Sequence, residues 1–203
     1  MIKKGIILAG GTGTRLSPLT KSVNKQLLPI HDKPMIFYPL SVMMLANIKK
    51  ILMIVNPGQI NNFKSLLGDG SRYGININYK IQDKPRGLPD AFILGKTFIN
   101  KDNVALILGD NFFYGQSLTK KLEKSSVHKF GATIFLKEVS SPENYGVAKI
   151  KKKKIEKIIE KPKKFVSKNA ITGLYFFDKN VSDYAKKLNK SKRGELEITD
   201  LIK

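Results

Sequence analysis

The sequence predicts an α/β sandwich in which helices cover a sheet whose central strands are parallel. Three short runs are apolar on both faces, which is the pattern of strands covered from both sides. Helix-like stretches separate these runs, and the repeated β-α-β order implies right-handed crossover connections. The length of 203 residues suits one domain, which we assign to residues 1–203.

The elements of the first two thirds of the chain alternate between strand and helix. The apolar runs that predict strands are Gly5–Ala9, Ile51–Val55, Val104–Leu108 and, later, Ala132–Leu136. The helical candidates between them are Pro39–Ala46, Gln59–Leu67 and Leu88–Phe98.

The last third of the chain begins with a charged β-hairpin. Its predicted strands are Val147–Ile150 and Ile155–Ile159, with the solvated run Lys151–Lys154 at its tip. Ile171–Phe177 is a further buried strand, Lys179–Leu188 is helical, and Glu195–Ile202 begins another helix. The chain stops inside this last pattern without a capping signal, so we expect a C-terminally truncated chain.

The composition excludes several classes of protein. The sequence contains no cysteine, which excludes disulfides and fits a reducing compartment. It contains no apolar segment long enough to span a membrane and no signal peptide, so we expect a cytoplasmic protein with no membrane partner. The net charge is +21, but only four of the 37 basic residues are arginine, whereas nucleic-acid readers favour arginine. We therefore expect a solvated lysine surface and no nucleic-acid partner.

A glycine-rich turn follows the first predicted strand. Glycines at Gly10–Gly13 allow backbone N–H groups to approach an anion, and Arg15 adds a positive charge beside them. Leu16 stands where a dinucleotide-binding fingerprint needs glycine, and a Walker A motif is absent. The turn is either a phosphate-binding loop of another kind or simply a tight strand-to-helix connection.

Two charged residues could complete a phosphate site. Asp110 follows the third apolar strand after one glycine, at the edge of a parallel sheet where ligands bind. Magnesium takes one or two protein carboxylates and completes its shell with phosphate oxygens and water, so Asp110 is a candidate ligand for Mg²⁺. Lys25 could fold back over the same phosphates, although it could also be one more surface lysine.

Together these motifs resemble the sugar-phosphate nucleotidyltransferase family, and within it the glucose-1-phosphate thymidylyltransferases. The resemblance runs from Lys4 to the last residue, and it is the ordered set of motifs that makes it specific. The motifs are Gly10–Thr20, Lys25–Pro29, Asp32–Ile36, Leu67–Ser71, Leu108–Asn111, Tyr145–Val147, Glu160–Pro162, Thr172–Phe176 and Arg193–Asp200.

The resemblance implies a three-layer, Rossmann-like nucleotidyltransferase sandwich with a mixed, mostly parallel sheet, and a Mg²⁺-assisted reaction. In that reaction dTTP and α-D-glucose 1-phosphate give dTDP-glucose and pyrophosphate. The dTDP-glucose supplies activated sugar for L-rhamnose and related surface polysaccharides. The implied catalytic residues are Arg15, Lys25, Asp110 and Lys161, with Asp110 as the metal ligand. The implied nucleotide-binding residues are Leu8, Gly10, Gly11, Thr12, Gly13, Thr14, Arg15, Gln26, Gln82, Gly87 and Asp110, with Gln82 and Gly87 at the base. The implied sugar-phosphate-binding residues are Asn111, Tyr145, Gly146, Glu160, Lys161, Thr172 and Arg193.

Two departures from the family pattern leave alternatives open. The segment after Gly87 commonly reads Gly-Leu-Ala-Gln-Ala in the family, whereas here Pro89 and Asp90 replace the alanine and glutamine, which leaves UTP as an alternative to dTTP. The family's second metal-binding aspartate and C-terminal helices have no counterpart in this sequence. A fragment or pseudoenzyme that binds nucleotide with little turnover is therefore the second alternative, and a homo-oligomer (a tetramer in the full-length family) is the implied assembly.

Overall fold

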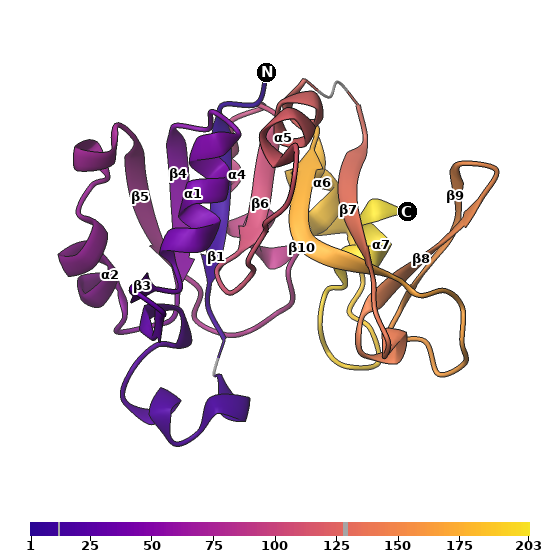
Figure 1. Cartoon of the computed structure of the whole chain (residues 1–203), viewed down its shortest axis with the longest axis horizontal. Coiled ribbons are helices and arrows are strands. Elements are labelled where there is room, and N and C mark those ends of the chain that lie inside the picture. The colour runs from indigo at the N-terminus through magenta and orange to yellow at the C-terminus, as the bar shows by residue number, and fades with distance from the viewer. Residues whose placement is uncertain (12, 128–129) are drawn as a thin grey trace.

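The computed structural model describes residues 1–11, 13–127 and 130–203, and its main feature is an eight-stranded mixed sheet (Figure 1). The strand order is β5-β4-β1-β6-β10-β8-β9, and β7 pairs with β10 outside this path. The first four strands of this order are parallel to one another. Their bounds are Asn76–Ile81 for β5, Lys50–Val55 for β4, Lys4–Ala9 for β1 and Val104–Leu108 for β6.

The other half of the sheet is antiparallel and is organised around one long strand. This strand, β10, pairs with β6, β7 and β8, and β8 forms a hairpin with β9. The bounds are Asn169–Phe177 for β10, Ala132–Glu138 for β7, Gly146–Lys151 for β8 and Lys154–Glu160 for β9. The mixed sheet and the hairpin insertion agree with the expected fold class.

Two separate hydrophobic cores fill the spaces between the sheet and the helices on its two faces. One core includes buried residues of α1 (Phe37–Leu45), α2 (Ile60–Leu67) and α5 (Leu118–Ser126). The other includes buried residues of α3 (Asp90–Leu94), α4 (Lys96–Ile99), α6 (Val181–Lys187) and α7 (Ile198–Ile202). Ile6 and Ile7 are both fully buried but belong to opposite cores, which explains why the central strands are apolar on both faces.

The predicted helix Leu88–Phe98 is wrong as one continuous element. It is two short helices, α3 and α4, because Gly95 between them has φ −80° and ψ 2° and ends the first helix. The predicted helix Glu195–Ile202 also begins later than expected, at Ile198. Leu196 instead pairs with Gly87, and its N–H donates to the carbonyl of Arg86 at 2.8 Å, so this segment is extended.

The strand β5 and the helix α5 lie where no regular element was expected. The edge strand β5 has polar residues at alternate positions, and α5 is a helix with four charged residues and few apolar ones. The hairpin strands extend one residue further at both ends than predicted, so the turn narrows to Lys152 and Lys153, which have φ values of 47° and 62°.

The segment between β1 and α1 returns the chain to the sheet edge. It contains 3₁₀ turns at Thr14–Leu16, Leu19–Lys21 and Lys25–Leu27 and a small two-stranded sheet, β2 (Pro29–Ile30) with β3 (Lys33–Pro34). Its end is held by main-chain bonds, since the N–H of Ile36 donates to the carbonyl of Gln26 at 2.9 Å. This path brings the third turn beside the end of β1.

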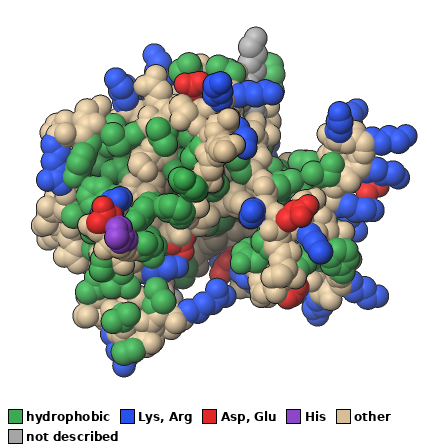
Figure 2. Space-filling view, viewed as in Figure 1, with side chains coloured by type: hydrophobic (Ala, Val, Ile, Leu, Met, Phe, Trp, Pro, Cys, Tyr) green, Lys and Arg blue, Asp and Glu red, His purple; other side chains and the backbone are tan. Residues whose placement is uncertain are grey.

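The lysine side chains are spread over the surface and do not form a single basic groove on the face that Figure 2 shows. Many of them project from the β8–β9 hairpin, where Lys149 and Lys151 both pair with Glu156. Within the described ranges, no helix is long and apolar enough to cross a membrane.

Candidate active site

The carboxyl ends of the four parallel strands meet at one edge of the sheet. The register pairs Leu8 with Leu108, Ala9 with Val55, and Val55 with Ile81. The residues that follow the four strands therefore come together, which is where open α/β sheets bind ligands. A pocket of about 250 Å³ lies there, and its lining residues are Leu8, Gly10, Gly11, Gln26, Gln82, Pro85, Gly87, Leu88, Leu108, Asp110 and Glu195.

The glycine turn after β1 is clamped by an asparagine from the end of β4. The N–H of Gly11 donates to Asn56 Oδ1 at 3.2 Å, and Asn56 Nδ2 donates to the carbonyl of Gly11 at 2.8 Å. Gly11 has φ 98°, a conformation that strongly favours glycine. Asn56 therefore holds the glycine turn in place with two hydrogen bonds. One of them engages the N–H of Gly11, which was expected to face phosphate.

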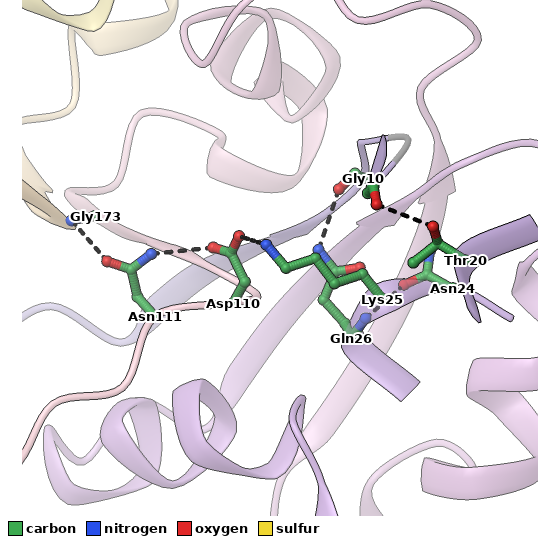
Figure 3. Close-up of polar contacts among 9 residues, drawn as sticks. Gly10, Thr20, Asn24, Lys25, Gln26, Asp110, Asn111 and Gly173 are labelled. Carbon is green, nitrogen blue, oxygen red and sulfur yellow. Dashed lines mark hydrogen bonds and ion pairs between the residues drawn. The ribbon is translucent and has the colours of Figure 1, made fainter. Parts of the chain in front are cut away.

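The third 3₁₀ turn places a lysine against the carboxylate that follows β6. Lys25 Nζ donates to Asp110 Oδ2 at 2.6 Å, and the two side chains are 29% and 30% exposed (Figure 3). Asn24 caps this turn, since its Oδ1 accepts from the N–H of Gln26 at 2.9 Å. Gln26 Nε2 in turn donates to the carbonyl of Gly10 at 3.1 Å, which ties the turn to the glycine loop.

Asp110 is connected to the antiparallel half of the sheet through Asn111. Asn111 Nδ2 donates to Asp110 Oδ1 at 3.0 Å, and Asn111 Oδ1 accepts from the N–H of Gly173 on β10 at 3.0 Å (Figure 3). A Cβ atom on Gly173 would lie 2.7 Å from Asn111 Oδ1, so this approach needs glycine. Both oxygens of the Asp110 carboxylate therefore have a donor.

The far end of the pocket is formed by Gln82, after β5, and by Gly87. Gln82 is 7% exposed, and its Nε2 donates to Asp90 Oδ2 at 2.8 Å. Gly87 has φ 99°, and a Cβ atom there would lie 2.0 Å from the carbonyl oxygen of Leu196. This loop thus packs directly on the extended segment before α7.

A second polar cluster lies beside the pocket and is centred on Arg193. Its Nη1 is 3.4 Å from Glu160 Oε1 and 3.6 Å from Glu197 Oε1, and its Nη2 is 3.3 Å from Glu195 Oε2. Burial, and secondarily the negative charge of Glu197, raises the pKa of Glu160. Because Glu195 also lines the pocket, this cluster connects the pocket to the base of the β8–β9 hairpin.

The predicted residues fall into two groups in the structure. The pocket brings together Leu8, Gly10, Gly11, Gln26, Gln82, Gly87 and Asp110, with Lys25 in contact with Asp110. At the base of the hairpin, Glu160 and Gly146 are paired across β8 and β9, and the N–H of Lys161 donates to the carbonyl of Tyr145 at 3.0 Å.

Several predicted residues are not in the pocket wall. Arg15 and Thr14 are exposed on the turn that follows Gly13, and Thr12 lies outside the described residues. The hydroxyl of Thr172 donates to the carbonyl of Phe135 on β7 at 2.9 Å, so its proton is engaged within the sheet.

Sequence reasoning missed three residues that shape the site: Asn56, Asp90 and Glu195. A signal existed for Asn56, since it follows a parallel strand at the same edge as Gly10 and Asp110. The sequence marked Asp90 only as a departure from the family pattern and Glu195 only as part of a family motif, because their contacts depend on how loops pack against each other.

A family model described as "Nucleotidyl transferase" matches residues 4–203 of the chain. The chain belongs to the nucleotidyltransferase family. Glucose-1-phosphate thymidylyltransferase of Neisseria meningitidis serogroup A is 54% identical over 98% of the chain, which spans 69% of that relative. The enzyme of the same name from Xanthomonas campestris pv. campestris strain B100 is also 54% identical, over 98% of the chain and 68% of the relative.

Solved structures show that the fold of this nucleotidyltransferase is shared. A Bacillus anthracis protein assigned as a glucose-1-phosphate thymidylyltransferase, in complex with a sucrose, superimposes with a TM-score of 0.90 at 42% identity, covering 98% of this chain and 80% of that one. A UDP-glucose pyrophosphorylase complexed with UDP-glucose superimposes with a TM-score of 0.82 at 24% identity, covering 99% and 85%, which shows the fold alone. The resemblance recognised in the sequence is thereby confirmed.

Proposed function

We propose that this nucleotidyltransferase joins dTTP to α-D-glucose 1-phosphate, giving dTDP-glucose and pyrophosphate. The observation that carries the proposal is one pocket at the carboxyl edge of the parallel strands. There the glycine turn, Asp110 and Gln82 line a volume of about 250 Å³, and Lys25 is paired with Asp110. The names of relatives that are 54% identical support the choice of substrates.

The nucleotide would lie along the wall from Gln82 to Asp110. Gln82 and Gly87 would meet the base, because Gln82 offers the pocket an amide group and Gly87 exposes its backbone. Leu8 and Leu108 give the apolar surface between the two ends of the pocket. Gly10 and Gly11, which have no side chains, would let the triphosphate approach the main chain closely.

Positive charge at the phosphate end would stabilise the leaving pyrophosphate. Lys25 already lies at that end, and Arg15 is exposed on the adjoining turn, from which its guanidinium would reach a bound polyphosphate. We assign to both residues the stabilisation of the negative charge that develops on the leaving pyrophosphate. Such stabilisation accelerates transfer only where it is stronger in the transition state than in the ground state.

The carboxylate of Asp110 fits a magnesium ion, since Mg²⁺ binds to one or two protein carboxylates and otherwise to phosphate and water oxygens. Within the part of the chain that the structure describes, no group of three or more His, Asp or Glu side chains is placed to hold a metal, and this coordination needs no such group. When bound, Mg²⁺ would neutralise phosphate charge. Lys25 now holds one oxygen of Asp110 and would pass to the phosphates.

The sugar phosphate would bind between the pocket and the hairpin. Lys161 would hold its phosphate, with Arg193 beside it. Glu160, Gly146, Tyr145 and Asn111 would meet the sugar hydroxyls. Arg193 contacts three carboxylates, of Glu160, Glu195 and Glu197, so a phosphate there would compete with them.

The reaction needs no covalent enzyme intermediate. An oxygen of the sugar phosphate attacks the α-phosphorus of dTTP in line, and pyrophosphate leaves from the opposite side. Since two anions must meet, the work of the protein is to position them and to balance their charge. The two polar clusters described above would face the two anions.

Pyrophosphate release tests the proposal directly. The protein is incubated with Mg²⁺, α-D-glucose 1-phosphate and dTTP, UTP, dCTP or ATP in turn, and pyrophosphate is measured over time. Fastest release with dTTP supports the proposal, and fastest release with UTP favours the UTP-using alternative. Nucleotide binding without release would favour a fragment or pseudoenzyme, and neither binding nor release would refute the proposal.

A further inference from the structure

The amide of Gln82 is held between a buried carboxylate and the pocket. Its Nε2 donates to Asp90 Oδ2 at 2.8 Å, and the Asp90 side chain is only 4% exposed. On the pocket side, Gln82 Oε1 lies beside Gly10, where a Cβ atom would be 3.5 Å from it. Asp90 therefore lies behind Gln82, away from the ligand.

The carboxylate fixes which end of the amide faces the pocket. An ionised carboxylate only accepts hydrogen bonds, so the NH₂ group must point toward Asp90 and the carbonyl oxygen away from it. Rotating the amide by half a turn would place two acceptors together and lose a charge-assisted hydrogen bond. This disfavours the rotated state by at least about ten-fold.

Both partners are anchored on the main chain. The N–H of Gln82 donates to the carbonyl of Val55 at 2.9 Å, which continues the β4–β5 ladder. Asp90 is the first residue of α3, and Phe92 of the same helix is fully buried. Arg86 Nη1 lies 3.7 Å from the second oxygen of Asp90, which adds positive charge on that side.

We propose that Asp90 makes the pocket selective for pyrimidines with a hydrogen on N3, by holding the carbonyl oxygen of Gln82 toward the base. This inference rests on the proposed function, in which Gln82 meets the base. Thymine and uracil donate from N3 to that oxygen, whereas cytosine presents a lone pair at N3. Asp90 is a positioning residue, because it acts through Gln82 and does not touch the ligand.

The substitution Asp90→Asn separates orientation from packing. Asparagine has nearly the same shape, but its side chain both donates and accepts, so the amide of Gln82 can adopt either orientation. When the competent orientation falls from nearly full to half occupancy, the Kd for dTTP rises about two-fold. The orientation that suits cytosine rises from about a tenth to a half, so the Kd for dCTP falls about five-fold.

The experiment is calorimetric titration of wild type, Asp90→Asn and Asp90→Ala with dTTP and with dCTP, without sugar phosphate so that no turnover occurs. We expect the Kd for dCTP divided by the Kd for dTTP to fall about ten-fold in Asp90→Asn, because the affinity for dTTP decreases while the affinity for dCTP increases. A purely structural role would weaken both ligands together, so a parallel loss overturns the inference. Equal affinities in the wild type, or an unchanged ratio in a folded variant, also overturn it.

A spectroscopic readout covers variants that fail to fold. In the wild type labelled with ¹⁵N-glutamine, one side-chain N–H of Gln82 should exchange slowly with solvent because Asp90 holds it. Fast exchange of both hydrogens refutes the inference. If the wild type prefers dTTP and the ratio shifts as expected, but no pyrophosphate is released, the proposed function fails while the role of Asp90 stands.

Discussion

Replacing Gly87, a half-buried loop residue, with alanine should lower the temperature at which the protein unfolds by much more than a loop position would suggest. The new methyl carbon would lie 2.0 Å from the carbonyl oxygen of Leu196 and 2.8 Å from its nitrogen. No side-chain rotation can relieve this contact, because both atoms belong to the main chain. The Gly87–Leu196 bridge must therefore open.

The expected loss has two separable parts. The φ of 99° costs alanine about 1–2 kcal/mol in free energy of unfolding. Opening the bridge loses the hydrogen bond from Leu196 to Arg86 and the packing of Leu196, which adds about 1–3 kcal/mol. At about 2–4 °C per kcal/mol, the midpoint of thermal unfolding should fall by roughly 10 °C.

Gly74→Ala is the matched control. Gly74 also has a positive φ, 70°, but a Cβ atom there would meet nothing within 4 Å. It should lose only the backbone part, roughly 4 °C. Thermal unfolding followed by circular dichroism gives both values, and titration with dTTP should show lost affinity only in Gly87→Ala. Equal melting temperatures for the two variants would show that the Gly87–Leu196 contact is not made.

Three further expectations concern the charged residues. Arg15→Ala should lower turnover by about a hundred-fold while changing the Kd for dTTP little, because leaving-group charge peaks in the transition state. Steady-state rates and calorimetry measure the two quantities, and a collapse of affinity with turnover spared would contradict this role. Asp110→Asn should shift the midpoint of a Mg²⁺ titration of turnover upward by about ten-fold or more, and an unchanged midpoint would remove Asp110 as the metal ligand. Folding raises the pKa of Glu160 above its ordinary value of 4.5, so the folded protein disfavours the charged form of this side chain. Glu160→Gln should therefore melt at a higher temperature than wild type at neutral pH. This advantage should be lost as the pH falls below 4.5, where the wild-type carboxyl is protonated in the unfolded chain as well. If the melting temperature of Glu160→Gln rose further above that of wild type on acidification, this reasoning would be refuted.

The parallel half of the fold could be predicted because its strands are short apolar runs covered on both sides. Ile51–Val55 and Val104–Leu108 carry this pattern, and the structure extends only the first, by one residue. The strand β5 could not be found in this way. It lies at the sheet edge, where alternate side chains face water, and six residues of alternating polarity are a weak signal.

The helix ends were harder to predict because tertiary contacts decide them. Periodicity favours one helix over Leu88–Phe98, and nothing local shows that Gly95 adopts non-helical angles. Likewise Leu196 looks like the first turn of a helix, but its hydrogen bond to Arg86 keeps it extended. At Leu196 a contact between distant segments thus overrides a local helical preference.

The positions of Gly10 and Asp110 followed from topology, since Gly10 directly follows β1, Asp110 follows β6 after one glycine, and these parallel strands end at the same edge. The partners of Arg193 did not follow. Its three carboxylates come from β9 and from the extended segment before α7, and their convergence depends on the antiparallel half of the sheet. The sequence predicted Arg193 as a site residue but did not predict its three carboxylate partners.

Three side-chain amides around the pocket are each fixed by a partner that leaves one orientation. Gln82 faces the Asp90 carboxylate, which can only accept, and Asn111 faces the N–H of Gly173, which can only donate. Asn56 meets both the N–H and the carbonyl of Gly11. A site whose polar groups are already oriented needs little rearrangement when charge moves within it, and such preorganisation is a major source of catalytic power. The partners are 8, 62 and 45 residues away in sequence, so this property could only be seen once the chain was folded.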